Sequence, residues 1–252
     1  MAVYNSSVTD LHGKTVLITG GARRLGRAMV LGVAKAGAQV AFTFLNSTTD
    51  ADETSKQLDQ LAVKHRALRC DVRSENSVAR TVETVLESFG RIDILINNAA
   101  IFETARLDQI TQEHWENLFA TNVGGPFLVS KHCTPALRQA KGRIINMGSL
   151  GGERPWVTHA HYCASKAALH MLTRVTAKAL APEIAVNCVA PGMIDPGEGD
   201  RDPGLLKRLA ERAPMGRNGT PDDVVSAVMY FTTSPHYITG QILTVDGGLG
   251  LV

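Results

Sequence analysis

The chain has 252 residues, of which 44% are hydrophobic and 20% charged, and its formal net charge at pH 7 is +2. This composition is typical of a globular protein with a sizeable core, and so small a net charge argues against a nucleic-acid surface. No segment approaches about eighteen uninterrupted apolar residues, and the N-terminus lacks the features of a signal peptide. The four cysteines show no metal-type or redox-type spacing. We therefore expect a cytoplasmic protein with reduced thiols and neither a membrane nor a nucleic-acid partner.

Short apolar runs alternate with longer segments of helical periodicity. The runs are rich in β-branched residues and occupy residues 14–19, 38–44, 65–70, 92–97, 142–147, 184–189 and 241–245. Helical patterns between them include residues 25–37, 77–90 and 224–234. This alternation predicts βαβ units and a doubly wound parallel sheet of about seven strands, covered by helices on both faces. No linker-like composition divides the chain, so residues 1–252 are predicted to form one domain.

The first predicted strand is followed by the loop TGGARRLG, residues 19–26. Gly20 follows the strand and Gly26 lies in the first turn of the next helix, where backbone N–H groups and the helix dipole favour an anion. Arg23, Arg24 and Arg27 place cations at the positive end of that dipole, which costs about 0.3–1 kcal/mol each unless an anion binds there. A phosphate site is the functional interpretation, and an ordinary tight turn with solvated arginines is the alternative.

The end of the second predicted strand bears on the identity of that phosphate. Asn46 and Ser47 stand where a carboxylate would bind the adenosine ribose of NAD. A missing acid together with added basic residues favours the 2′-phosphate of NADP(H).

Tyr162 and Lys166 occur in the stretch YCASK, and their i,i+4 spacing places both side chains on one face of a helix. An ammonium beside a phenol favours the phenolate and brings proton transfer towards neutral pH. Ser149, thirteen residues before Tyr162, follows a predicted strand and offers a hydroxyl that can stabilise a developing alkoxide. A single Tyr-x3-Lys occurs easily by chance, so the prediction depends on this combination.

The order and spacing of the glycine loop, NNAA at residues 97–100, Ser149, the Tyr-x3-Lys pair and Pro191-Gly192 resemble the short-chain dehydrogenase/reductase family. The resemblance extends from Lys14 to Gly248. It implies a Rossmann fold, a nicotinamide cofactor, a small-molecule substrate and a homotetramer joined through the helices that carry Asn122 and Tyr162.

The resemblance also assigns roles to individual residues. Asn122 would anchor a water and complete a catalytic tetrad with Ser149, Tyr162 and Lys166, while Lys166 would also hold the nicotinamide ribose. The implied cofactor-binding residues are Gly20, Arg23, Arg24, Leu25, Gly26, Asn46, Ser47, Asp71, Val72, Asn98, Ala99, Ala100, Tyr162, Lys166, Pro191, Gly192 and Ile194.

One departure concerns Arg24, because the family usually has glycine there. Its pteridine reductase branch resembles this chain in having that arginine and a phenylalanine, here Phe102, shortly after the NNA motif. In that branch the arginine reaches the cofactor diphosphate and the substrate pocket. Some pteridine reductases carry Asp in place of Ser149, so the retained serine resembles ordinary ketone reduction instead. The threonine that often binds the nicotinamide carboxamide is missing near Pro196.

The remaining candidates lie around the predicted substrate site. Trp156 is expected to border the substrate together with Phe102, Ser149 and Tyr162, with a core or subunit contact as its alternative. His159 and His161 lack partners spaced for a metal, so no metal site is expected. Residues 193–216 contain a charged Gly/Pro stretch, which is either a lid over the substrate or a solvated loop.

Taken together, these patterns predict an NADP(H)-dependent oxidoreductase that transfers a hydride to a ketone or 3-oxoacyl carbonyl, with Tyr162 as proton donor. A pteridine reductase is the alternative activity. A non-catalytic NADPH-binding protein is the third hypothesis, which the complete set of Ser149, Tyr162 and Lys166 disfavours.

Overall fold

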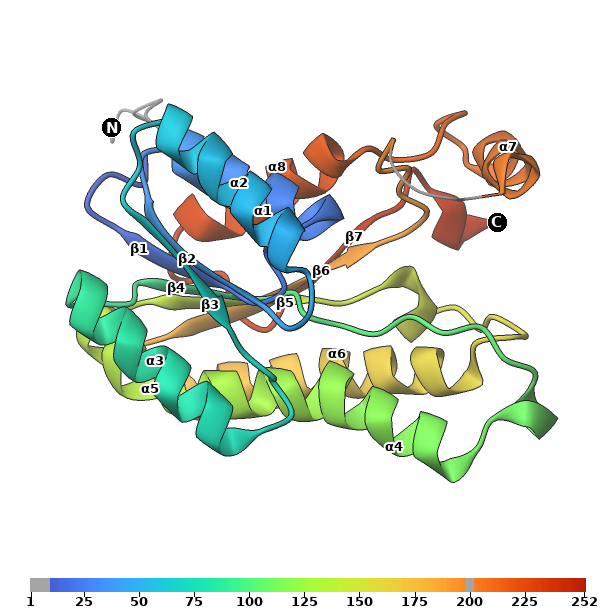
Figure 1. Cartoon of the computed structure of the whole chain (residues 1–252). Helices are drawn as coiled ribbons and strands as arrows, with labels where there is room; N and C mark the ends of the chain where they lie inside the picture. Colours follow the sequence, from blue (N-terminus) through green and yellow to red (C-terminus); the bar gives the residue numbers. More distant parts are fainter. Residues whose placement is uncertain (1–9, 198–201) are drawn as a thin grey trace.

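The computed structural model describes residues 10–197 and 202–252. Its sheet contains seven strands, all parallel, in the order β3-β2-β1-β4-β5-β6-β7 (Figure 1). The strands are β1 (Thr15–Ile18), β2 (Gln39–Phe44), β3 (His65–Arg69), β4 (Ile94–Asn97), β5 (Arg143–Met147), β6 (Ala185–Pro191) and β7 (Ile242–Val245). Each predicted apolar run forms one of them, so the doubly wound sheet is confirmed.

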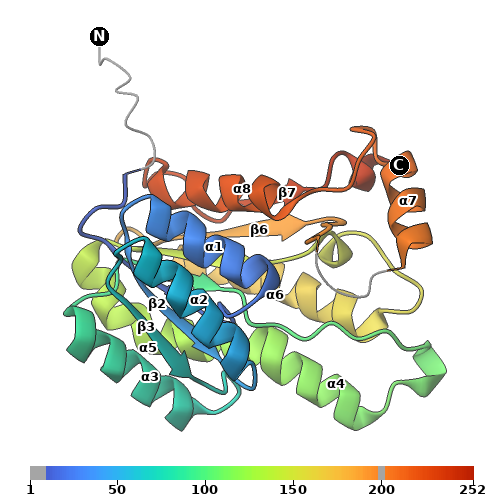
Figure 2. The same cartoon turned by 45° about the horizontal axis from the view of Figure 1, so that its top comes forward.

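Helices cover both faces of this sheet (Figures 1 and 2). On one face lie α1 (Arg24–Lys35), α2 (Thr48–Gln60) and α8 (Pro221–Thr233), and on the other lie α3 (Glu75–Phe89), α5 (Gly125–Ala140) and α6 (Ala160–Leu180). Two shorter helices, α4 (Gln112–Phe119) and α7 (Pro203–Arg212), lie beyond the strand ends. None of the helices in the described ranges is long and apolar enough to cross a membrane.

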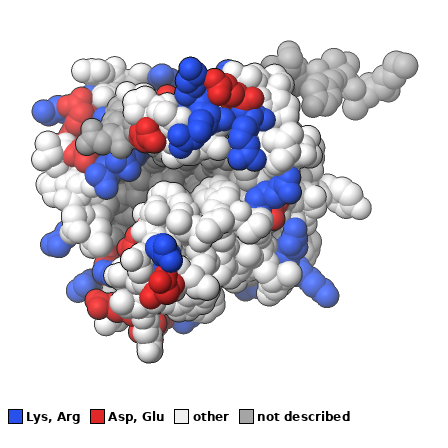
Figure 3. Space-filling model, turned by 90° about the vertical axis from the view of Figure 1, so that its right-hand side faces the viewer, with Lys and Arg blue, Asp and Glu red and all other residues white. Residues whose placement is uncertain are grey.

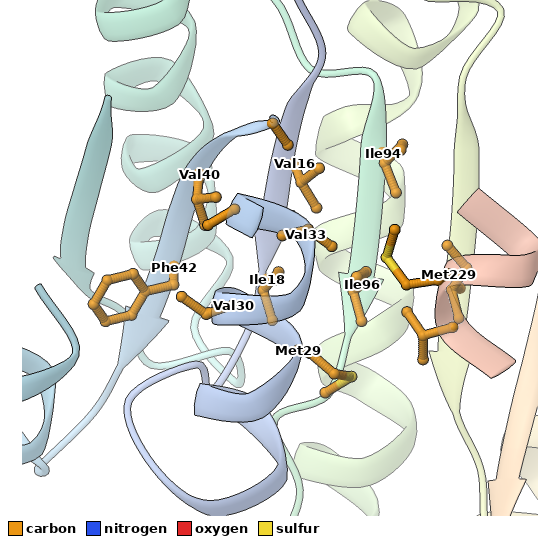
Figure 4. Close-up of a cluster of buried hydrophobic side chains, with 14 of the residues drawn as sticks. Val16, Ile18, Met29, Val30, Val33, Val40, Phe42, Ile94, Ile96 and Met229 are labelled. Carbon is orange, nitrogen blue, oxygen red and sulfur yellow. The ribbon is translucent and has the colours of Figure 1, made fainter. Parts of the chain in front are cut away.

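Strand geometry divides the apolar residues between two cores. Val16 and Ile18 of β1 belong to the cluster beneath α1 and α8, whereas Leu17 between them belongs to the cluster beneath α3, α5 and α6. Successive strand residues point to opposite faces, which is why an uninterrupted apolar run suits a strand covered on both sides. Figure 4 shows the first cluster, with Met29 and Val33 of α1 packed over the strands.

Two elements were not predicted from the sequence. The helix α7 lies within the expected substrate loop 193–216, and the charged residues Glu198, Asp200 and Arg201 of that loop lie outside the described residues. Residues Ala120–Gly124 form a π-helical turn between α4 and α5. Such turns occur frequently at functional sites.

Candidate active site

The loops that follow β1, β2, β3 and β4 converge on a cavity of about 520 Å³. Figure 3 shows the hollow on this face of the molecule, with Lys and Arg side chains along part of its rim. Many predicted cofactor residues line the cavity: Gly20, Arg23, Arg24, Leu25, Gly26, Asn46, Ser47, Asp71, Val72, Asn98, Ala99 and Ala100. Pro191, Gly192 and Ile194, at and beyond the end of β6, do not line it, and neither do Tyr162 and Lys166 of α6.

Two glycines of the loop between β1 and α1 are required by close packing. A Cβ atom on Gly26 would lie 2.0 Å from the carbonyl oxygen of Gly20. Gly20 has φ +65°, and a Cβ there would lie 2.9 Å from the Cα of Ala99. The side-chain amide of Asn98 donates to the carbonyl oxygens of both Thr19 and Gly20, at 2.9 Å each. The loop is therefore held against the end of β4 without any ligand.

The three arginines of this loop separate into two kinds. Arg23 and Arg24 are exposed at the cavity, and within the described ranges neither side chain has a hydrogen bond or an ion pair. Arg27 instead donates to the hydroxyl of Thr54 at 2.9 Å and lies 3.3 Å from the Asp50 carboxylate. Because these bonds join α1 to α2, Arg27 acts as a structural residue. Arg23 and Arg24 are therefore the arginines of this loop whose charges are available to an anion in the cavity.

Arg73 is a cavity residue that sequence reasoning missed. Its guanidinium forms two bonds with the Asp71 carboxylate, at 2.9 and 2.7 Å, and a third with the side-chain oxygen of Asn117 at 2.6 Å. The side-chain hydrogen bond from Arg73 lowers the pKa of Asp71. Asp71 therefore remains ionised, and the guanidinium of Arg73 balances its charge. The same ion pair fixes the orientation of the Asp71 carboxylate at the cavity wall.

Tyr162 and Lys166 are buried on one face of α6, as their spacing predicts. The Lys166 Nζ donates to the carbonyl oxygen of Met147 at 2.7 Å and lies 5.8 Å from the centre of the Tyr162 ring. Burial lowers the pKa of Lys166 to about 8. The ammonium is therefore anchored to the end of β5 beside the phenol, with both of its protonation states accessible near neutral pH.

Ser149 lies two residues beyond β5 and is buried. Its Oγ accepts the N–H of Gly151 at 3.1 Å, which begins the short 3-10 turn Leu150–Gly152. That turn packs against α6. No described group accepts the hydroxyl proton of Ser149, so the proton is available to a ligand.

Asn122 lies inside the π-helical turn, with its side chain fully engaged. Its Oδ1 accepts the N–H of Ile101 at 2.8 Å, and its Nδ2 donates to the Ile101 carbonyl at 3.0 Å and to the Ser165 hydroxyl at 3.1 Å. Both amide protons of the Asn122 side chain are therefore used within the protein. The π-helical turn was not predictable from the sequence.

Aromatic side chains surround the Tyr162 ring. The Trp156 ring is stacked on it with centroids 6.0 Å apart, and the Phe102 ring meets it edge-on at 4.8 Å. Phe102 also stacks on His159 at 4.8 Å while remaining 59% exposed. Two of the predicted pocket residues, Phe102 and Trp156, thus lie against Tyr162. Among the described residues, no group of His, Cys, Asp and Glu could hold a metal ion.

The chain is similar to known proteins over nearly all of its length. A family profile described as Enoyl-(Acyl carrier protein) reductase matches residues 20–250. The chain is 34% identical to a 3-oxoacyl-[acyl-carrier-protein] reductase of Synechocystis sp., covering 96% of this chain and 99% of that one. It is also 34% identical to the corresponding reductase of Thermotoga maritima, covering 95% and 98%.

Solved structures agree with the sequence relatives. A dehydrogenase/reductase from Sinorhizobium meliloti matches with a TM-score of 0.90 at 34% identity, covering 96% of this chain and 97% of that one. A short-chain type dehydrogenase/reductase from Mycobacterium marinum matches with a TM-score of 0.88 at 31% identity, covering 96% and 97%. The chain therefore belongs to the short-chain dehydrogenase/reductase family of oxidoreductases.

Proposed function

We propose that this oxidoreductase uses NADP(H) to reduce a ketone or 3-oxoacyl carbonyl, with Tyr162 as the proton donor. The observation that carries the proposal is the buried Lys166, anchored to Met147 and placed 5.8 Å from the Tyr162 ring. Burying an ammonium group costs free energy. An ammonium beside a phenol has a catalytic use, because it stabilises the phenolate that forms when the phenol gives up its proton. The two 3-oxoacyl-[acyl-carrier-protein] reductases among the relatives support the carbonyl substrate over a pteridine.

Support for NADP(H) comes from the cavity wall. Arg23 and Arg24 line a cavity that also receives the N-terminus of α1. The N-cap residue of α2, Ser47, lines it too and makes no side-chain capping bond, so a second helix N-terminus faces this space. Helix N-termini and unpaired guanidinium groups favour phosphate. The residues therefore fit a dinucleotide with an additional phosphate, bound between Arg23 and the end of β2.

The residues that line this cavity would hold NADPH, which would supply the hydride. Ser149 donates its free hydroxyl proton to the carbonyl oxygen and stabilises the charge that develops there. Tyr162 delivers its proton to that oxygen, and Lys166 stabilises the phenolate that remains. The main chain of Asn122, in the π-helical turn, is the group we assign to holding the water that returns the proton. Phe102 and Trp156 shield the reaction from bulk water and contact the substrate.

We further propose a cytoplasmic homotetramer. The four cysteines are free thiols, as expected in a reducing compartment. Outward-facing apolar side chains on α4, α5 and α6 are those of Trp115, Phe127, Met171 and Val175. These are the helices on either side of the π-helical turn and the helix that carries Tyr162, which the family resemblance assigns to subunit contacts.

A substrate screen tests the function. NADPH oxidation is followed at neutral pH with a panel of ketones, a 3-oxoacyl thioester and dihydrobiopterin. We expect turnover of a ketone or the thioester, and loss of at least about a hundredfold in kcat for Tyr162→Phe, since general acid catalysis contributes about 10²–10⁴. Unchanged kcat in Tyr162→Phe would refute the assigned proton donor. Tight NADPH binding without turnover of any compound would favour the non-catalytic hypothesis, and turnover of dihydrobiopterin alone would favour a pteridine reductase.

A further inference from the structure

The catalytic face of α6 carries a third polar residue. Tyr162, Lys166 and His170 follow one another at i,i+4 spacing, and all three are buried. The imidazole of His170 lies against the segment that presents Ser149. A Cβ atom on Gly148 would lie 2.4 Å from its Nε2, and one on Gly152 would lie 2.7 Å from its Cε1. The ring thus occupies the space that side chains at both glycines would need.

His170 also makes a directed contact with Ser149. The backbone N–H of Ser149 donates to its Nε2 at 3.4 Å. An imidazole that accepts at Nε2 is neutral and carries its proton on Nδ1. That Nδ1 lies 3.9 Å from Oε1 of Glu153, while Oε2 of Glu153 accepts the hydroxyl of Thr244 at 3.4 Å. The carboxylate therefore favours the tautomer that the Ser149 contact requires.

The surroundings keep this ring in its accepting form. Burial lowers the pKa of His170 to about 4, and the cations Lys166 and Arg174 of the same helix lower it in the same direction. Glu153, beyond the 3-10 turn, is the acidic group that faces the ring. From β6, Cys188 borders the same space beside Gly148 and bears no charge, because burial raises the pKa of its thiol to about 12. His170 is thus a neutral acceptor at the pH of most cytoplasmic reactions.

We propose that His170 is a positioning residue for catalysis: it holds the main chain of Ser149 through Nε2, so that the Ser149 hydroxyl stays directed at the reacting carbonyl. Glu153 supports it by fixing the tautomer. The proposal rests on the role assigned to Ser149 under the proposed function. It explains why Gly148 and Gly152 lack side chains, since the ring that orients the loop fills those positions.

Two substitutions separate hydrogen bonding from packing. His170→Gln keeps an acceptor near the position of Nε2, whereas His170→Leu keeps much of the volume and removes the acceptor. The first measurement is amide hydrogen exchange of the peptide that covers residues 148–153, because it does not depend on turnover. We expect faster exchange in His170→Leu by about fivefold to tenfold, the factor for one neutral hydrogen bond, and exchange close to wild type in His170→Gln.

The second measurement is steady-state kinetics in two backgrounds. His170→Leu should lower kcat by a similar factor of about fivefold to tenfold, while the Kd for NADPH stays unchanged and His170→Gln restores most of the loss. In the Ser149→Ala background, His170→Leu should cause no further loss, because its effect is exerted through Ser149. Glu153→Gln, at an exposed side chain, offers a milder variant and should lower kcat less than His170→Leu.

Several outcomes would overturn the proposal. Wild-type exchange in His170→Leu would show that the contact does not hold the loop. An equal loss in His170→Gln, or an undiminished loss in the Ser149→Ala background, would show that the ring acts by packing alone. If exchange responds as expected but Ser149→Ala retains full turnover, the role assigned to Ser149 under the proposed function has failed, and the positioning of a catalytic serine is refuted with it.

Discussion

At the scale of single residues, Arg24 combines an unfavourable backbone with an unpaired charge. Its φ is +50°, a conformation that favours glycine, and glycine is what the family usually has at this position. An L-residue in this region costs about 1–2 kcal/mol. A strained residue that persists at a ligand site points to a use for its side chain. The exposed guanidinium at the cavity supplies that use.

This argument predicts opposite effects on stability and binding. Arg24→Gly should raise the free energy of unfolding by up to about 1 kcal/mol, since the strain is relieved but glycine gains freedom in the unfolded chain. The same variant should weaken NADPH and NADH alike, because we propose that Arg24 contacts the diphosphate that they share. Urea denaturation and fluorescence titration with each cofactor measure the two effects.

Arg23→Ala is the matched variant on the same loop. It should chiefly reduce the preference for NADPH over NADH, by about tenfold or more, since a charge-assisted bond contributes about 1.5–3 kcal/mol. Stability should change little because Arg23 has extended backbone, with φ −149° and ψ 168°. Equal loss of NADPH preference in both variants would show that selecting NADPH and binding the shared diphosphate are not separate roles of Arg23 and Arg24.

At the scale of elements, the turn between β1 and α1 is fixed by packing as well as by any ligand. Gly26→Ala should lower the free energy of unfolding by more than about 3 kcal/mol or prevent folding, because its Cβ would lie 2.0 Å from the Gly20 oxygen, a backbone atom that has no room to move. Gly124→Ala is the control, since a Cβ there would meet only the Phe119 oxygen, at an ordinary 3.8 Å. Thermal unfolding measures the melting temperature of both variants, and similar melting temperatures would contradict the prediction.

The elements differ in how far the sequence predicts them. Strands such as β1 were predictable because they are continuous apolar runs, as in TVLI. The helix α7 was not predicted, because the charged Gly/Pro stretch before it favoured a loop, although the Asp202 cap, Pro203 and the amphipathic pattern of PGLLKRLAER are helix signals. The π-helical turn was also missed, because its hydrogen bonds differ from those of an α-helix by one residue in register, and no composition marks that shift.

The candidate site shows the same division between local and long-range information. Tyr162 and Lys166 were predictable from local spacing on one helix. The partners of Arg27 and Arg73 were not, since Thr54 and Asn117 are brought to them by packing of distant segments. His170 carried an available signal, the continued i,i+4 spacing after Lys166, but its contact with Ser149 depends on how the β5 loop lies on α6.

At the scale of the whole molecule, stability should depend on pH through His170. Its pKa is about 4 in the folded protein against an ordinary 6.5, so the unfolded state takes up a proton first as the pH falls. The stabilisation is complete above pH 6.5 and is lost progressively towards pH 4. Relative to His170→Gln, the wild-type free energy of unfolding should therefore fall by about 1–2 kcal/mol between pH 7 and pH 5 in urea titrations. A constant difference between the two proteins would contradict this.

The proposed tetramer makes a second prediction at this scale. Met171→Glu on α6 should convert a species of four times the 27.0 kDa protomer into a smaller one, because it places a carboxylate where an apolar side chain is expected to be buried. Light scattering coupled to size-exclusion chromatography measures the mass. Gln60→Glu, an exposed change on α2, is the control and should leave the mass unchanged. A monomeric wild-type protein would refute the proposed assembly.

The hydrogen bonds of Asn122 join the π-helical turn to the segment that carries Phe102. Its side chain clamps both main-chain groups of Ile101, and the next residue is Phe102, whose ring meets Tyr162. The same side chain also binds Ser165 on α6. Under the proposed function, a substitution at Asn122 should therefore change the position of Phe102 beside Tyr162 as well as the proposed path of the proton.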